Sequence, residues 1–521
     1  MEIFQNKAVL IKTRTPEKYA IIPRSRVVAT HPGGGATVAV YWGLDEMRVL
    51  RNLGVRNVPS PIRRNYTWPG RYRPMQHQIA TAEFFTMHRR CFCFNEQGTG
   101  KTLAALWAAD YLMSRGEVRR VLVLCPVSTM QSVWIGDINS SIIHRSAVVA
   151  HHSTAIRRIE LVQSGYEIVI VNYDGLALIA PEVIRDGRFD LVIADEANHY
   201  KNPQTERWRA LAKIMQPTTF LWMMTGTPAA QSPVDAYGLA KLVNPSGVPQ
   251  FKTAWRDKVM RKVTKFKYVP VDNAKDLVNA ALQPAIRFSK AQCLDLPPVV
   301  YETRTVEMTP QQHKYYKIVK EQMLAQVAGT TITAVNAGVV VNKLLQISAG
   351  AVYSDDGDTI EFDSTPRLKV LQELIDGTDR KVLVFALFRS CIETITKFLE
   401  KRGITYAQIH GDVKQMDRGH IINEFQAQPE PRVLVMQPFA TAHGITLTAA
   451  DTVVFYGPLM SVDMYLQCVA RADRKGQAAD KVTVYHIQSS PVEQRLFDAM
   501  SKKVDDQSLL VKMFEEEVAE K

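Results

Sequence analysis

Residues 91–102 read Cys91-Phe92-Cys93-Phe94-Asn95-Glu96-Gln97-Gly98-Thr99-Gly100-Lys101-Thr102, an apolar run followed at once by a glycine-rich loop. A helical pattern of apolar residues continues over 104–109. A strand, a glycine loop and a helix in this order are typical of a phosphate-binding loop. Glycines leave backbone N–H groups free to surround phosphates, and the helix N-terminus adds positive potential. The segment therefore predicts a nucleotide site in an α/β domain.

The residues of this loop have separate expected roles. Lys101 would reach the β- and γ-phosphates of ATP, and the Thr102 hydroxyl would coordinate Mg²⁺. The stricter motif has glycine where Asn95 stands, so the match is partial at that position. The residues of the loop expected to bind the cofactor are Gly98, Thr99, Gly100, Lys101 and Thr102.

An acidic pair follows a second apolar run. Asp195 and Glu196 come directly after Leu191–Ala194, which places the first carboxylate at the edge of a sheet, where it can bind Mg²⁺. Glu196 would orient or deprotonate the attacking water. Such a pair is often only a polar loop. The phosphate-binding loop upstream favours the catalytic interpretation.

Two series of short apolar strands alternate with helical segments, as in parallel sheets covered by helices. The expected fold class is α/β, with two RecA-like parallel-sheet lobes in tandem and a small N-terminal module that contains β-structure. Ligands bind such sheets at the carboxyl ends of the strands. The expected strands are Cys91–Phe94, Val121–Cys125, Ile168–Val171, Leu191–Ala194, Phe220–Met224, Val382–Ala386, Tyr406–Ile409, Val433–Met436, Thr452–Phe455 and Val482–Ile487.

Composition divides the chain into five parts. The first is a small accessory module in which residues 27–42 read as a β-hairpin around three glycines. The segment 246–300 is rich in lysine and arginine, and is either a solvated connector or a basic lobe near a phosphate track. The expected parts are 1–68 for the module, 69–245 for the first ATPase lobe, 246–300 for the basic insertion and bridge, 301–497 for the second lobe and 498–521 for a C-terminal helical tail.

Charge and composition narrow the partners and the compartment. The net charge of +12 favours polyanions, because each neutralised phosphate releases condensed counterions. No apolar stretch approaches the ~20 residues that span a bilayer, so no membrane partner is expected. The six cysteines contain no CxxC pair, and Cys91 and Cys93 alternate with phenylalanines as buried thiols do. A cytoplasmic location is expected, or the host cytoplasm if the protein is viral.

The second lobe contains a glutamine and two arginines at helical spacing. Gln467, Arg471 and Arg474 would share one face of a helix, since spacings of three and four bring side chains together. They could form an ordinary solvated stripe. Another interpretation is that the two arginines spread positive charge onto a transferring γ-phosphoryl group.

Taken in order, these segments resemble the motifs of the Swi/Snf-type translocases of helicase superfamily two. The resemblance spans about residues 71–497. Asn198 stands where the family has histidine, and the match at 440–447 is partial. The motif segments are 73–76, 123–126 with Trp134, 172–173, 195–198 with 201–202, 225–228, 287–298, 382–390, 410–411, 417–418, 440–451 and 467–477.

The resemblance implies an ATP-dependent translocase on double-stranded DNA, in a compact version of a viral or bacterial kind. It adds Gln76 and Gly444 to the cofactor-binding residues, and implies catalytic roles for Lys101, Glu196, Gln467, Arg471 and Arg474, with Mg²⁺ bound by Thr102 and Asp195. Single-stranded DNA or RNA remains possible as the partner. A strand-separating helicase, or a DNA scaffold that hydrolyses little ATP, remains an alternative. The implied nucleic-acid contacts are Pro126, Ser128, Asn172, Tyr173, Arg389, His410 and Thr441.

Overall fold

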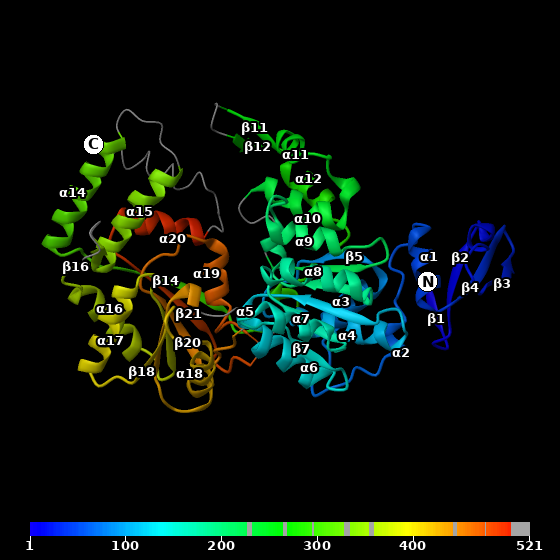
Figure 1. The fold of residues 1–521 in the computed structure, drawn as a ribbon, viewed down its shortest axis with the longest axis horizontal. Helices are drawn as coiled ribbons and strands as arrows, with labels where there is room; N and C mark the ends of the chain where they lie inside the picture. Colours follow the sequence, from blue (N-terminus) through cyan, green and yellow to red (C-terminus); the bar gives the residue numbers. More distant parts are fainter. Residues whose placement is uncertain are drawn as a thin grey trace. The chain divides into compact units, whose positions relative to one another are not determined.

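The computed structural model describes residues 1–226, 232–263, 268–293, 296–327, 334–353, 359–440, 445–474 and 476–501 (Figure 1). These residues divide into two compact units, the first ending at Cys293 and the second following it. Each unit is built on its own parallel sheet. The predicted α/β class with two RecA-like lobes is confirmed.

The main sheet of the first unit has seven parallel strands in the order β13-β5-β10-β9-β6-β8-β7. Side chains are buried on both of its faces, which explains the continuous apolar runs. All five strands expected in this lobe are present within two residues of the expected bounds. The strands are β5 (Arg90–Cys93), β6 (Arg120–Leu124), β7 (Ala147–Val149), β8 (Ile168–Val171), β9 (Phe189–Ala194), β10 (Phe220–Met224) and β13 (Ala285–Ile286).

Helices connect these strands and cover the sheet. The P-loop helix α4 is buried almost throughout its length, which requires its run of alanines and large apolar residues. The helices that belong to this lobe are α3 (Gln76–Met87), α4 (Lys101–Ser114), α5 (Val127–Thr129), α6 (Gly136–Ser141), α7 (Ala155–Gln163), α8 (Gly175–Asp186), α9 (Glu206–Ile214) and α10 (Ala236–Val243).

The N-terminal segment forms the expected β-structure. Four antiparallel strands pair in the order β1-β2-β4-β3, and β3 with β4 is the predicted hairpin. Trp42 and Met47 share a hydrophobic core with Phe85 and Trp107 of the first lobe, so the module belongs to the first compact unit. Its boundary at residue 68 stays a prediction. Its elements are β1 (Glu2–Phe4), β2 (Ala8–Thr13), β3 (Ser25–His31), β4 (Gly35–Tyr41), α1 (Leu44–Asn52) and α2 (Ile62–Asn65).

The segment 246–300 is more than a connector. Its short strand β13 pairs in parallel with β5 and completes the first sheet. Of the basic cluster, Lys258, Arg261 and Lys262 are exposed, whereas Lys265 and Lys267 lie outside the described residues. Most of the segment belongs to the first unit. Its other elements are α11 (Lys252–Val259), β11 (Met260–Lys262), β12 (Tyr268–Pro270), α12 (Ala274–Ala281) and α13 (Lys290–Cys293).

The second unit contains a six-stranded parallel sheet in the order β14-β21-β20-β17-β19-β18. The five strands expected here are present within two residues of the expected bounds. The strands are β14 (Val299–Thr305), β17 (Lys381–Phe385), β18 (Tyr406–Ile409), β19 (Val433–Met436), β20 (Ala450–Phe455) and β21 (Val482–Gln488), with β15 (Ala351–Tyr353) and β16 (Thr359–Glu361) as a separate hairpin.

Seven helices are described in this unit. The last, α20, crosses residue 497, so the proposed start of a tail at 498 falls inside a helix, and residues 502–521 lie outside the described part. The helices are α14 (Pro310–Val327), α15 (Ala334–Ala349), α16 (Thr365–Asp376), α17 (Arg389–Lys401), α18 (Gln415–Ala427), α19 (Val462–Val469) and α20 (Pro491–Ser501).

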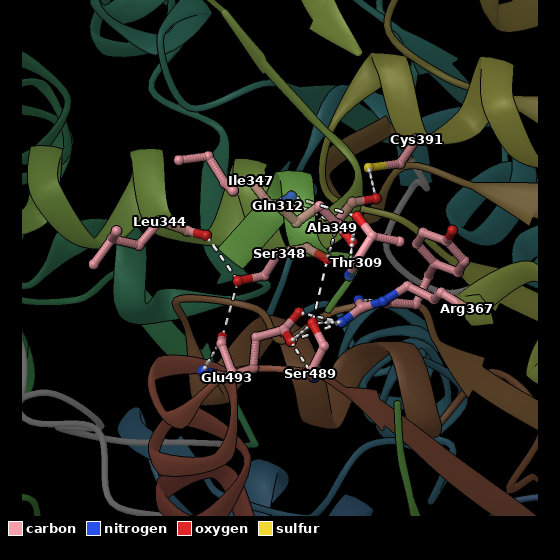
Figure 2. Close-up of polar contacts among 12 residues, drawn as sticks. Thr309, Gln312, Leu344, Ile347, Ser348, Ala349, Arg367, Cys391, Ser489 and Glu493 are labelled. Carbon is pink, nitrogen blue, oxygen red and sulfur yellow. Dashed lines mark hydrogen bonds and ion pairs between the residues drawn. The ribbon is translucent and has the colours of Figure 1, made fainter. Parts of the chain in front are cut away.

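A buried ion pair ties these helices to the sheet. Arg367 of α16 contacts Glu493 of α20 at 2.7 Å, and both side chains are almost completely buried (Figure 2). The guanidinium also donates to the Tyr456 carbonyl, beyond β20, and to the Ser489 hydroxyl, beyond β21. Ser489 in turn donates to the carbonyl of Ser348 at the end of α15. A buried charge left without its partner costs about 3–5 kcal/mol, so this network fixes three helices at one edge of the sheet.

The cysteine thiols and the helices can be compared with the expectations that composition gave for core thiols and for membrane-spanning segments. Cys91 and Cys93 are free and completely buried, as expected of core thiols. Among the described residues, no helix has the length and apolar character that crossing a membrane requires.

Candidate active site

The phosphate-binding loop lies between the end of β5 and the start of α4. Gly98 and Gly100 have φ values of +80° and +75°, a region that favours glycine. A Cβ atom on Gly100 would lie 2.2 Å from Nε2 of Gln78, which donates to the Gly100 carbonyl at 3.3 Å. The backbone conformation therefore favours glycine at position 100, and any larger residue there would also displace the end of the Gln78 side chain.

Lys101 is the first residue of α4, and its ammonium is held within the loop. Its Nζ donates to the carbonyls of Asn95 at 2.8 Å and of Glu96 at 3.3 Å. The buried hydroxyl of Thr99 donates to the Glu96 carbonyl, which closes the turn before the helix. The cation and the helix N-terminus thus face the same turn, and Thr102 follows in the first turn of the helix.

Asn95 has a structural role that the sequence did not predict. Its Nδ2 donates to the hydroxyl of Thr81 in α3 at 2.9 Å, and its Oδ1 accepts the backbone N–H of Phe288 at 3.0 Å. A glycine at this position could make neither bond. The amide therefore anchors the loop to α3 and to the segment after β13.

Helix α3 supports the loop through residues that sequence analysis missed. Gln76 is its first residue and its side chain is exposed. The neighbouring His77 contacts the Thr99 carbonyl through Nε2 at 2.8 Å, and Gln78 contacts Gly100 as described above. In the sequence, only the adjacency of His77 and Gln78 to Gln76 could have indicated their role. The contact of Gln76 with a nucleotide stays a prediction.

Asp195 follows β9 directly, as expected. Its Oδ2 accepts the indole N–H of Trp134 at 3.2 Å, and its Oδ1 accepts the N–H of Glu196 at 3.1 Å. Lost hydration, and then repulsion by Glu196, raise the pKa of the Asp195 carboxyl to about 6, while Lys101 acts in the opposite direction. A cation bound here would relieve that repulsion.

Glu196 has an unusual backbone conformation. Its φ is +47°, in the left-handed region that non-glycine residues rarely adopt. Such strain is found at functional sites, where the surrounding structure imposes it. It turns the chain sharply after Asp195, so the two successive carboxylates do not continue the alternation of the strand.

Tyr173 and Asn172 follow β8. The Tyr173 hydroxyl donates to the Asp195 carbonyl at 2.7 Å, and its ring stacks on His199 with centroids 4.3 Å apart. Tyr173 is only 5% exposed. In this arrangement the tyrosine positions the acidic loop, and its contact with nucleic acid stays a prediction.

The other predicted nucleic-acid contacts lie in both units. Pro126 and Ser128, after β6, are half-buried. In the second unit Arg389 is half-buried at the start of α17 and forms ion pairs with Glu393 and Asp412. His410, after β18, is buried, and lost hydration followed by the charge of Arg389 lowers its pKa. Thr441 and Gly444, which were also predicted, lie outside the described residues.

The expected shared helical face of Gln467, Arg471 and Arg474 is wrong. Helix α19 ends at Val469, and both arginines lie in the tight turns that follow. The reason is that the chain must turn inward here. Ala472 is completely buried, and the Arg471 carbonyl accepts the N–H of Leu447 at 2.9 Å.

The two arginines nevertheless contact one segment. Nη1 of Arg471 donates to the Ile445 carbonyl at 3.4 Å, and Nη1 of Arg474 donates to the Thr446 hydroxyl at 3.2 Å. Gln467 bonds instead to Asp463, within its own helix. The structure thus joins the arginines to residues 445–447, and the glutamine to Asp463.

The oxygen donors around the loop suit Mg²⁺. Magnesium is usually bound by one or two carboxylates together with phosphate oxygens and waters. Asp195 and the Thr102 hydroxyl supply donors of this kind. Among the described residues, no group of three or more His, Cys, Asp or Glu side chains could hold a metal by itself. The donor set therefore fits a metal that is shared with a bound phosphate.

Comparison with known families gives two matches along the chain. The SNF2-related domain family matches residues 38–349, and the helicase conserved C-terminal domain family matches residues 366–476. The first match covers more than half of the 521 residues and includes the phosphate-binding loop and the acidic pair. The second includes Arg471 and Arg474.

Individual relatives are distant. "Putative protein p41" of Acyrthosiphon pisum secondary endosymbiont phage 1 is 24% identical over 80% of this chain and 92% of its own length. The mouse "Chromodomain-helicase-DNA-binding protein 1-like" is 24% identical over 89% of this chain, which spans 54% of that protein. The solved "Sulfolobus solfataricus SWI2/SNF2 ATPase core in complex with dsDNA" is 20% identical, with a TM-score of 0.41, over 84% of this chain and 92% of that chain.

Proposed function

This chain belongs to the SNF2-related family and is a nucleic-acid-dependent ATPase of helicase superfamily two, and from that premise we propose that it is an ATP-driven translocase on double-stranded DNA. The observation that carries the proposal is the phosphate-binding loop, whose Lys101 lies close enough to Asp195 to affect the pKa of its carboxyl. A cation and a carboxylate beside one glycine loop are what a nucleotide with its metal requires.

The chemistry assigns a role to each residue. The backbone of residues 98–102, the Lys101 ammonium and Gln76 bind ATP, with Gly444 contributing from the second lobe. Asp195 and Thr102 would hold Mg²⁺, which would supply charge neutralisation at the phosphates. Glu196 orients the attacking water and accepts its proton. Arg471 and Arg474 stabilise the charge on the transferring phosphoryl group, and Gln467 assists them.

We propose the five-part division at residues 68, 245, 300 and 497 as the functional organisation, with the last part beginning inside α20. Nucleic acid is gripped mainly through phosphates, which accept many kinds of side chain and carry no sequence information. A motor that grips phosphates has no need to unpair bases. Its proposed contacts are Pro126, Ser128, Asn172, Tyr173, Arg389, His410 and Thr441.

The test compares polynucleotides as activators of the ATPase. Duplex DNA is expected to stimulate turnover more than single-stranded DNA or RNA, and ATP-dependent displacement of a triplex-forming strand would report movement along the duplex. Affinity should fall steeply with salt, since binding releases counterions. Efficient separation of a forked duplex, or activation by RNA alone, would support a helicase. Negligible turnover with every polynucleotide would support a scaffold.

Glu196→Gln is expected to bind ATP normally and hydrolyse it at least ~100-fold more slowly, because the proton acceptor is lost while side-chain length is kept. Glutamine also leaves the strained backbone as it is. ATP affinity and single-turnover hydrolysis would separate the two effects. The exposed Glu206→Gln, in the same lobe, is the matched control and should turn over like the wild type. A Glu196→Gln rate near the wild-type rate would exclude this carboxylate from catalysis.

A further inference from the structure

The N-terminal sheet presents two aromatic rings on its outward face. Val9, Ile11, Val38 and Val40 of β2 and β4 point into the core, so the alternate residues of these strands point outward. Phe4 pairs with Ala8, and Ala8 pairs with Tyr41. Phe4 and Tyr41 therefore lie in one row on the outward face, separated by a strand that contributes only a methyl group. Their side chains are 49% and 42% exposed.

Cations outnumber acidic residues near these rings, although Glu2 of β1 lies in the row of Leu10 and Ala39 on the same face. Arg26 pairs with Ala39 in the next row of the same face, and Lys12 pairs with Thr37 in the row beyond. The Arg24 guanidinium lies over the Tyr41 ring at 4.0 Å from its centroid and pairs with Glu46 at 2.6 Å, so one face of this ring is covered and the other is left for a base. Within the part of the chain that the structure describes, no acidic group comes within 4.0 Å of the amino groups of Lys12 or the guanidinium of Arg26. These charges are therefore available to an external anion.

The module also carries much of the positive charge of the chain. Residues 1–68 contain eleven lysines and arginines but four aspartates and glutamates, a surplus of seven, whereas the whole chain has a net charge of +12. Most of these cations are exposed, including Lys7, Arg14 and Lys18. A surface potential of this sign attracts polyanions.

The module is held firmly to the first lobe. Arg48 of α1 contacts Glu117 at 2.6 Å and the Thr86 carbonyl at 2.8 Å, both in the first lobe. With the shared core described above, these bonds hold the sheet in a fixed position on the ATPase lobe. A strand bound to the sheet would be held at a fixed distance from the phosphate-binding loop.

We propose that the outward face of this sheet is a second nucleic-acid-binding surface, and that it takes an unpaired strand. Exposed aromatic side chains on a sheet can stack with bases only where the bases are unpaired. In a duplex, both faces of each base are already covered by the neighbouring base pairs. Lys12 and Arg26 would contact the phosphates beside those bases, whereas Arg24 is already paired with Glu46. The surface goes beyond the translocase function and does not depend on it.

The test measures binding of a labelled single-stranded oligodeoxynucleotide, the matching oligoribonucleotide and a blunt duplex to the full chain, without ATP. Phe4→Ala with Tyr41→Ala should weaken binding of the single strands about 10-fold or more and change duplex affinity less than about 2-fold. The single variant Tyr41→Phe should bind single strands like the wild type, since the aromatic ring remains. Arg26→Glu should reduce the salt dependence of single-strand binding.

Matched controls lie elsewhere in the same unit. Phe251→Ala removes a ring that is 65% exposed, and Lys213→Glu reverses an exposed charge on α9. Neither should affect single-strand binding. Wild-type binding by the Phe4/Tyr41 double variant, or an equal loss of duplex binding, would overturn the proposal. The translocase proposal is tested separately, because the same double variant should keep its duplex-stimulated ATPase.

Discussion

Lys101→Ala is expected to abolish ATP turnover, lowering it by at least ~10²- to 10³-fold, the scale for removing one preorganised charge-stabilising donor. The ammonium lies at the start of α4, within hydrogen-bond reach of the loop carbonyls that surround the expected phosphates. Steady-state ATP hydrolysis with saturating duplex DNA measures the effect. Lys101→Arg should also be inactive, because the planar guanidinium cannot replace the compact ammonium.

The fold should survive this substitution. Lys101 loses two bonds to backbone carbonyls, so the free energy of unfolding should fall by about 1 kcal/mol for each of them. Thermal melting would confirm a folded protein. Lys213→Ala, an exposed lysine in the same lobe, should retain full activity. Normal turnover by a folded Lys101→Ala protein would mean that ATP is hydrolysed at another site.

The central strands were predictable because their environment is simple. Strands in the middle of a parallel sheet are buried on both faces, so they appear as short continuous apolar runs such as Ile168–Val171. The phosphate-binding loop was predictable for a related reason. Glycines with left-handed backbone and a lysine at a helix start are local requirements, as the φ values of Gly98 and Gly100 confirm.

Features that depend on distant contacts could not be predicted. The amide of Asn95 bonds to Phe288, 193 residues away, and β13 is a strand of two residues that is defined only by its pairing with β5. Likewise, helix α19 ends where the Arg471 carbonyl bonds to Leu447. The spacing of residues 467, 471 and 474 alone predicts that the helix continues. Spacing contains no information about a hydrogen-bond partner on another segment.

The N-terminal module was also only partly predictable from the sequence. Its hairpin was predictable from the glycines between two β-rich runs. Its attachment was not, because the apolar face of α1, with Met47 and Leu50, packs against residues of the first lobe such as Phe85. A sequence pattern shows that a helix has an apolar face but does not show what covers it.

Arg471→Ala and Arg474→Ala are each expected to lower kcat by ~10³-fold or more, with a much smaller effect on ATP affinity, if they act as arginine fingers. The reason is that the charge they stabilise develops mainly in the transition state. The guanidiniums contact the successive residues Ile445 and Thr446, so the turn after α19 holds them as a pair. Single-turnover hydrolysis and equilibrium ATP binding, measured for each variant, would separate kcat from affinity.

A structural defect could also lower kcat, and this explanation applies more to Arg471→Ala than to Arg474→Ala. Arg471 is only 4% exposed, so its removal also leaves a gap in the second unit, whereas Arg474 is half-buried and its substitution tests the chemistry more directly. Arg432→Ala is the matched control, because Arg432 also donates to backbone carbonyls in that unit, including that of Ile375 at 2.9 Å. It should change stability and leave kcat near the wild-type value. Loss of ATP binding with kcat retained in Arg474→Ala would mean that this arginine only holds ground-state phosphates. An equal loss of kcat in Arg432→Ala would mean that the effect reports the integrity of the second unit, and the finger assignment would then be withdrawn.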